Sequence, residues 1–394
     1  MAPRGSLLVM QSGGPTPVVN QALAGVVDEA RALGVARVYG AFHGLEGLLS
    51  GDLTDLTDVS RARLGRIART PSAAMGSTRR RLADEDVAAL LDSLRTYDIR
   101  YLHIIGGNDS AETGHRLAAE AAGAGWELAV VNVPKTIDND LVLTDHCPGY
   151  GSAARFIALA TMGAGRDAEA MATENGGTVI EVMGRDAGWL PAASALGKRE
   201  DRDAPHFVGI PEVPVDVDRF VEVMADARAR HGFAVAVVSE NARGPDGVIG
   251  AQGEPYYVDE FAHPYYEGPA RFLAKALAAR LGRRVRVDAP GSIQRSLPST
   301  VSSTDARESE MAGRAAVAAA ITGESDRMVT LARSDDDTYR CETGLATLAD
   351  VAGRVRTLPK SYYDQVTSLP TEAFYTYAAP LLGAALPRFE RLLG

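Results

Sequence analysis

The sequence predicts an α/β protein with mostly parallel sheets covered by helices. Short runs rich in β-branched residues alternate with amphipathic segments rich in Ala, Leu and Arg. A glycine-rich or polar loop follows each run, the usual arrangement in a parallel sheet. The 394 residues suffice for two or three domains or one two-lobed unit. Ligands bind at the carboxyl ends of parallel strands, so the loops there are the candidate site.

We expect strands over 6–10, 100–105, 127–133, 177–182 and 233–239. A helix over 18–33 follows the first strand, and one over 111–122 follows the second, with Asp109 or Ser110 as a possible cap. A short helix should follow the polar loop 183–186. The segments 199–214 and 245–268 are interpreted as irregular excursions. The second is either an exposed loop whose tip could cover a ligand or a plain surface loop.

Composition excludes several classes of protein. The net charge of −10 argues against nucleic-acid and membrane-surface binding, but one local basic pocket could still bind phosphate. The two cysteines, Cys147 and Cys341, show no CxxC or Cys/His spacing, which argues against a disulfide scaffold or a structural zinc motif. No apolar run reaches the roughly 18 residues of a membrane span. The stretch 7–10 is too short for a signal-peptide core, so we expect a cytoplasmic protein.

Three loops that follow predicted strands contain the main candidate catalytic and binding residues. The first, 12–15, contains Gly13 and Gly14, which let backbone amides approach an anion, but it matches neither a P-loop nor a dinucleotide fingerprint. The second, 106–110, taken by itself, is better explained as the capped start of a helix. The third, 134–140, is the most specific, because it combines Lys135, Thr136 and two acids. Lysine can neutralise phosphate, while paired carboxylates can divide proton acceptance and metal orientation.

Pro-Lys-Thr-Ile-Asp-Asn-Asp after Gly-Gly-x-Asp-Ser closely resembles the phosphofructokinase family, in particular its pyrophosphate-dependent branch. Further blocks in the family's order, over roughly residues 6 to 385, are 76–79 (Gly-Ser-Thr-Arg), 182–185 (Val-Met-Gly-Arg), 239–240 (Ser-Glu), 291–295 (Gly-Ser-Ile-Gln-Arg), 328–331 (Met-Val-Thr-Leu) and 343–345 (Thr-Gly-Leu).

The resemblance implies a magnesium-dependent enzyme of glycolysis that moves a phosphoryl group from pyrophosphate to the 1-hydroxyl of fructose 6-phosphate. The reaction gives fructose 1,6-bisphosphate and phosphate and is close to reversible. It implies two similar Rossmann-like lobes with the active site in the cleft between them, and a homodimer or homotetramer. Residues 1–148 with roughly 300–345 would form the phosphoryl-donor lobe. Residues 149–299 with the C-terminal segment to 394 would form the sugar-phosphate lobe.

The resemblance also assigns roles to residues. Asp138 would be the general base, with Lys135 and Thr136 as further catalytic groups, and Thr136 and Asp138 would also contact the sugar. The metal would lie at Asn108 and Asp140. The remaining donor-binding residues would be Gly13, Gly14, Arg79, Asn108 and Asp109. The remaining sugar-phosphate residues would be Met183, Gly184, Arg185, Glu240, Arg286, Ser292 and Arg295.

The choice of donor depends on two positions, because ATP-using relatives carry glycine in place of both Asp109 and Lys135. We hypothesise that Asp109 excludes ATP and that Lys135 stabilises the transferring phosphoryl group. Asn108 replaces the magnesium-binding Asp of many relatives, Ser292 replaces a His, and Gly176 replaces an arginine that binds phosphate across subunits. The alternatives are an ATP-dependent phosphofructokinase, a kinase of another small alcohol, including a longer sugar phosphate such as sedoheptulose 7-phosphate, and a silent sugar-phosphate-binding paralogue.

Overall fold

The computed structural model describes residues 3–251, 254–258, 264–334 and 338–392. The chain divides into two compact units: unit 1 is 1–152 with 295–356, and unit 2 is 153–294 with 357–394. The unit boundaries therefore follow residues 152, 294 and 356, whereas the sequence predicted them near 148, 299 and 345. Ser152 bonds the carboxylate of Asp305 through its backbone N–H (2.9 Å) and its hydroxyl (2.5 Å), so it belongs to unit 1. Leu348 and Val351 lie in a hydrophobic cluster of unit 1.

Unit 1 contains a seven-stranded sheet in the order β15-β14-β5-β4-β1-β2-β3. Its central strands are parallel, and the β2–β3 and β14–β15 pairs at the edges are antiparallel, so the predicted mostly parallel sheet is confirmed. The strands are β1 (Ser6–Gln11), β2 (Val38–Ala41), β3 (Leu53–Asp55), β4 (Ile99–Gly106), β5 (Ala129–Pro134), β14 (Arg327–Arg333) and β15 (Cys341–Thr347).

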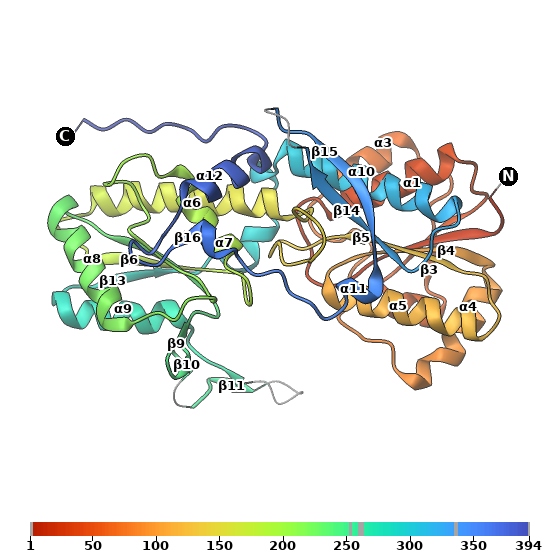
Figure 1. Cartoon of the computed structure of the whole chain (residues 1–394), viewed down its shortest axis with the longest axis horizontal. Helices are drawn as coiled ribbons and strands as arrows, with labels where there is room; N and C mark the ends of the chain where they lie inside the picture. The colour runs from red at the N-terminus through yellow and green to blue at the C-terminus, as the bar shows by residue number, and fades with distance from the viewer. Residues whose placement is uncertain (1–2, 252–253, 259–263, 335–337, 393–394) are drawn as a thin grey trace. The chain divides into compact units, whose positions relative to one another are not determined.

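Helices cover both faces of this sheet (Figure 1). Helices α1 (Val19–Ala32), α3 (Arg61–Ala68) and α10 (Ser303–Ile321) pack on one face. Helices α2 (Leu45–Ser50), α4 (Val87–Thr96), α5 (Asn108–Gly123) and α11 (Leu348–Val351) pack on the other. Helix α1 illustrates the cause: Val19, Leu23, Val26 and Ala30 recur at helical spacing and are all buried.

Unit 2 contains a four-stranded parallel sheet in the order β13-β6-β8-β7. Its strands are β6 (Gly177–Val182), β7 (Phe207–Gly209), β8 (Val235–Ser239) and β13 (Val285–Asp288). Helices α8 (Val217–His231) and α9 (Pro269–Leu281) pack on one face, and α6 (Tyr150–Ala170), which begins in unit 1, runs along the other (Figure 1). The short helices are α7 (Trp189–Ala193) and α12 (Glu372–Ala378).

Two expectations need correction. The segment 199–214 is not wholly irregular, because it contains the buried strand β7; three residues are too few to show an alternating pattern. Helix α5 begins at Asn108, not at Ala111, so neither Asp109 nor Ser110 caps it, and its N-cap is Gly107.

The segment 245–268 forms parts of two small hairpins, β9 (Arg243–Gly244) with β10 (Gly247–Val248) and β11 (Tyr257–Val258) with β12 (Pro264–Tyr265). Residues 252–253 and 259–263 of it lie outside the described residues, and its role as a ligand cover stays a prediction. The last hairpin in the chain pairs β16 (Tyr363–Asp364) with β17 (Leu369–Pro370). Among the described residues, no helix combines the length and apolarity needed to cross a membrane.

Candidate active site

The three predicted loops of unit 1 lie at one edge of the sheet. Strands β1, β4 and β5 are parallel neighbours, with Gln11 opposite Ile105 and Gly106 opposite Pro134. Their carboxyl ends therefore meet, and the loops beginning at Ser12, Gly107 and Lys135 start side by side. The sheet topology thus supports the site that the sequence patterns predicted in this unit.

Lys135 lies at the centre of this edge. Its side chain is almost fully buried, with the residue 4% exposed, and Nζ donates a hydrogen bond to the Gly14 carbonyl at 2.7 Å. A Cβ atom on Gly13 would lie 3.2 Å from this ammonium, and one on Gly14 would lie only 2.5 Å from Nη1 of Arg295. The two glycines therefore let cationic side chains approach the first loop closely.

The charges around Lys135 suit a phosphate group. Burial lowers the pKa of Lys135 to about 8, against the opposing influence of Asp138 and Asp140, while Arg295 and Arg79 lower it further. An ammonium held in the interior near two guanidinium groups is strained by repulsion and desolvation. A bound anion would relieve both, so this edge of the sheet is ready to accept a phosphate or diphosphate.

The acidic residues of the third loop lie next to the second loop. Thr136 Oγ1 accepts the backbone N–H of Asp138 at 3.1 Å, which fixes the turn and leaves Asp138 partly exposed. Asn108 Nδ2 donates to Oδ2 of Asp140 at 3.2 Å. Burial raises the pKa of Asp140, although a hydrogen bond from Thr136 opposes that shift.

The geometry of Asn108 fits a role at a metal site. Because its amide nitrogen faces Asp140, its oxygen Oδ1 points elsewhere; that atom is buried and has no hydrogen-bond partner within the described parts of the chain. Turning this amide by about 180° would direct Oδ1 toward Asp140, and an amide oxygen beside a carboxylate is a donor set that a hard divalent cation prefers. With the amide so turned, Asn108 and Asp140 could together hold a divalent cation.

The shape of the third loop depends on residues without reactive roles. Asn139 adopts a positive φ of 56°, and its Oδ1 accepts the N–H of Cys147 at 2.9 Å. The guanidinium of Arg356 donates to the carbonyl oxygens of Asn139 (2.8 and 3.1 Å), Thr144 (2.9 Å) and Asp145. Sequence reasoning missed Arg356, and no local motif marks it.

Two further donor-site candidates lie on the rim. The block 76–79 packs on the first loop, since Ser77 Oγ donates to the Gly13 carbonyl at 2.6 Å and the Gly13 N–H donates to the Thr78 carbonyl at 2.9 Å. This contact brings the exposed Arg79 toward the site. Asp109 is also exposed, and its carboxylate pairs with Arg81 at 2.7 Å.

In unit 2, the candidate sugar residues gather beyond β6 and β8. The Glu240 N–H donates to the Val182 carbonyl at 2.8 Å. Ser239 Oγ donates to the Gly184 carbonyl at 2.7 Å, and Gly184 takes a φ of 114° that favours glycine. Asn241 Nδ2 holds the Arg185 carbonyl at 2.8 Å. Met183, Gly184, Arg185 and Glu240 are thus brought together, with the side chains of Arg185 and Glu240 exposed.

The Gly-Ser-Ile-Gln-Arg block reveals one positioning residue that sequence reasoning did not single out. Gln294 is buried, and its Oε1 accepts the N–H of Met183 at 3.0 Å. Ser292 is exposed in the same turn, while Arg295 belongs to unit 1 and lies against Gly14. Arg286 on β13 forms an ion pair with Asp167 of α6. The structure therefore places Arg295 with the donor candidates and Arg286 in the other unit.

Comparison with known proteins shows the family to which the chain belongs. Residues 6–320 match the family described as phosphofructokinase. The chain is 39% identical to pyrophosphate–fructose 6-phosphate 1-phosphotransferase of Rhodospirillum rubrum, covering 99% of this chain and 97% of that protein. It is 37% identical to the protein of the same name from Xanthomonas campestris, covering 97% and 93%. The solved structure of a pyrophosphate-dependent phosphofructokinase from Nitrosospira multiformis matches with a TM-score of 0.89 and 31% identity, covering 99% of this chain and 95% of that one.

Proposed function

This chain belongs to the phosphofructokinase family, and we propose that it transfers a phosphoryl group from pyrophosphate to the 1-hydroxyl of fructose 6-phosphate. The observation that carries the choice of donor is the environment of Lys135. Its ammonium is buried against the Gly14 carbonyl, with Arg295 and Arg79 near enough to lower its pKa. A compact, highly charged donor such as pyrophosphate matches such a concentration of positive charge.

The chemical step assigns a role to each acidic and polar group. As the 1-hydroxyl oxygen of the sugar forms its bond to phosphorus, Asp138 accepts the hydroxyl proton, and the bond to the leaving phosphate breaks. Thr136 orients the reacting groups from the same turn. Lys135 and Arg295 balance charge on the transferred group, and positioning with charge neutralisation supplies most of the rate enhancement.

Magnesium is our proposal for the cation at Asn108 and Asp140. Mg²⁺ binds through few protein oxygens and keeps contacts to the phosphate oxygens of its substrate, which suits a site with one amide oxygen and one carboxylate. When bound, it would neutralise developing charge on the diphosphate. Asn108 provides a neutral oxygen here, so the pyrophosphate itself should supply more of the metal's negative ligands than it would beside two carboxylates.

The sugar-phosphate residues of unit 2 complete the proposal. We assign the sugar hydroxyls to Glu240 and the loop of Met183 and Gly184, with Arg185 compensating phosphate charge. Arg286 remains our candidate for the 6-phosphate, which would then replace Asp167 as its partner. Arg295 stays a second candidate for the 6-phosphate, and because it lies against Gly14 we propose that its charge also acts on the donor.

We also propose that Asp109 discriminates against ATP by occupying space that a nucleoside-linked phosphate needs.

For assembly and location, we propose a homodimer or homotetramer in the cytoplasm. The exposed Ser292 leaves a longer acceptor, such as sedoheptulose 7-phosphate, as the second candidate for the sugar substrate.

The decisive experiment compares pyrophosphate with ATP as donor at saturating fructose 6-phosphate and Mg²⁺, and then repeats the comparison with sedoheptulose 7-phosphate. We expect rapid turnover with pyrophosphate and little with ATP. Asp138→Asn is the control, and it should lower kcat by about 10²–10⁴-fold. Comparable turnover with ATP would overturn the donor assignment, while silence with both donors and both sugars would favour a binding protein.

The two discriminating positions are tested together by Asp109→Gly with Lys135→Gly. The double variant should lose pyrophosphate turnover and gain ATP turnover. An unchanged ATP rate with an unimpaired pyrophosphate rate would refute the hypothesis about these residues without affecting the family assignment.

A further inference from the structure

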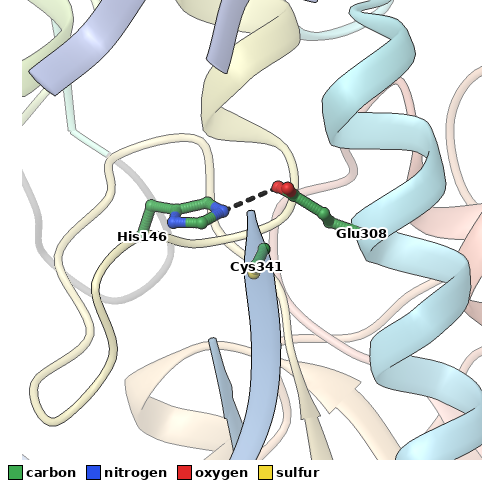
Figure 2. A group of neighbouring side chains, drawn as sticks. All are labelled: His146, Glu308 and Cys341. Atoms are coloured by element: carbon green, nitrogen blue, oxygen red, sulfur yellow. Dashed lines mark hydrogen bonds and ion pairs between the residues drawn. The ribbon is translucent and has the colours of Figure 1, made fainter. Parts of the chain in front are cut away.

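A second group of metal-ligating side chains lies in unit 1, apart from the proposed magnesium residues. His146 comes from the loop before α6, Glu308 from α10 and Cys341 from the start of β15 (Figure 2). One potential ligand atom from each of the three residues lies within 4.8 Å of the other two. His146 and Glu308 are buried, and Cys341 is partly exposed. The sequence offered no sign of this group, because the three residues are far apart along the chain.

From this convergence we propose that His146, Glu308 and Cys341 form a binding site for Zn²⁺. Imidazole, carboxylate and thiolate are the three side-chain ligands that zinc uses, and the thiolate disfavours Mg²⁺ and Ca²⁺. Three protein ligands leave one tetrahedral position for water. The proposal is independent of the pyrophosphate reaction, since none of the three residues is assigned a part in it.

The distances require only small movements. The imidazole Nε2 of His146 lies 2.7 Å from Oε2 of Glu308, a direct hydrogen bond. Around a tetrahedral zinc, with bonds of about 2.0–2.3 Å, neighbouring ligand atoms would be about 3.4–3.6 Å apart. The histidine and glutamate must therefore separate by less than about 1 Å, and the thiol, which lies within 4.8 Å of both, need approach by no more than about 1 Å.

The surroundings orient the histidine for this role. Nδ1 of His146 lies 3.1 Å from Oδ2 of Asp145, and the same carboxylate oxygen contacts Nη2 of Arg333 at 3.3 Å. A carboxylate on one ring nitrogen is the usual partner of a zinc-bound histidine, because it fixes the tautomer and directs the other nitrogen to the metal. Here that other nitrogen faces Glu308.

Tyr339 contacts both buried residues of the group, His146 and Glu308. Its hydroxyl donates to Oε1 of Glu308 at 2.8 Å and lies 3.4 Å from Nε2 of His146. The Glu308 carboxylate thus keeps a hydrogen bond on one oxygen while the other is directed at the histidine. When zinc binds, the thiol proton of Cys341 and any proton on Nε2 of His146 are released to solvent, so the ligands become anionic thiolate and neutral imidazole.

The test uses the full-length protein, stripped of metal with a chelator and kept reduced, and titrated with Co²⁺ and then Zn²⁺. We expect one equivalent of Co²⁺ to give a near-ultraviolet thiolate-to-cobalt band that Zn²⁺ displaces. Cys341→Ser should abolish the band and weaken Zn²⁺ binding by at least about 100-fold, more than the loss of an outer partner costs. The matched control is Cys147→Ala, which removes the other cysteine of the chain and should leave the band and the affinity unchanged.

The variants separate this site from metal bound elsewhere. Binding at Asn108 and Asp140 would persist in Cys341→Ser and would show no thiolate band. Absence of the band in the wild type, or equal Zn²⁺ affinity in Cys341→Ser, would overturn the proposal. Metal-free melting curves check that each variant is folded. Should Cys341→Ser not fold, the comparison of wild type with Cys147→Ala still decides whether the Cys341 thiolate binds the metal.

Discussion

Arg356 provides the sharpest test of how the third loop is held in place. Its guanidinium donates to the carbonyls of Asn139, Thr144 and Asp145, and its own N–H donates to the Asp140 carbonyl at 2.7 Å. The residue therefore fixes both ends of the segment that follows the proposed base. Replacing it by methionine removes the guanidinium and keeps most of the aliphatic stem.

The magnitude follows from the bonds that are lost. A hydrogen bond from a charged donor contributes about 1.5–3 kcal/mol, but Arg356 is only half-buried and water can satisfy some of the carbonyls. We therefore expect Arg356→Met to lower the free energy of unfolding by about 3 kcal/mol. For a unit of roughly 200 residues this corresponds to a melting temperature lower by about 6–12 °C.

The catalytic effect should exceed the structural one. A displacement of about 1 Å at a reacting group can cost about 100-fold in rate, so kcat should fall by that order while KM for pyrophosphate changes little. The assay measures kcat and KM together with thermal melts. The matched control is Arg354→Met, two residues away, where the arginine is exposed and pairs only loosely with Asp350 at 3.6 Å.

Two outcomes would refute this reasoning. An Arg356→Met variant with the wild-type kcat would show that the loop keeps its shape without the guanidinium. Equal losses in Arg354→Met and Arg356→Met would show that the effect is one of general charge. Arg356→Lys, which keeps the charge but can reach fewer carbonyls, should fall between wild type and Arg356→Met in both kcat and stability.

Three further predictions concern the candidate active site. Because the pKa of Lys135 is about 8, its ammonium loses a proton as pH rises through that value, and kcat/KM for pyrophosphate should fall above it. Lys135→Arg should remove this decline, and a flat pH profile in the wild type would contradict the role given to Lys135. Gln294→Leu should raise KM for fructose 6-phosphate by about 10-fold, because the variant loses the hydrogen bond from the Met183 N–H. An unchanged KM would show that Gln294 has no positioning role. Asn108→Asp adds a carboxylate beside Asp140, so the Mg²⁺ concentration that gives half the maximal rate should fall several-fold. An increase in that concentration would contradict the proposed metal site.

Local sequence patterns determined the fold class and the main site segment. The strand runs and the glycine-rich turns after them are properties of short stretches, so β1, β4, β5, β6 and β8 could be expected at nearly their observed bounds. Lys135, Thr136, Asp138 and Asp140 share one loop, which allowed a candidate site to be predicted there without coordinates. Short strands such as β7 were not predicted, because three residues are too few to show an alternating hydrophobic pattern.

The tertiary structure alone decided which distant residues support those loops. Arg356 reaches the third loop, Gln294 reaches Met183 and Arg295 reaches Gly14 only because the order of strands and helices brings their segments together. The same holds for His146, Glu308 and Cys341, whose spacing in the sequence argued against a zinc motif. Periodicity and loop chemistry act over a few neighbouring residues, whereas these contacts depend on the path of the whole chain, and a single sequence does not display that path.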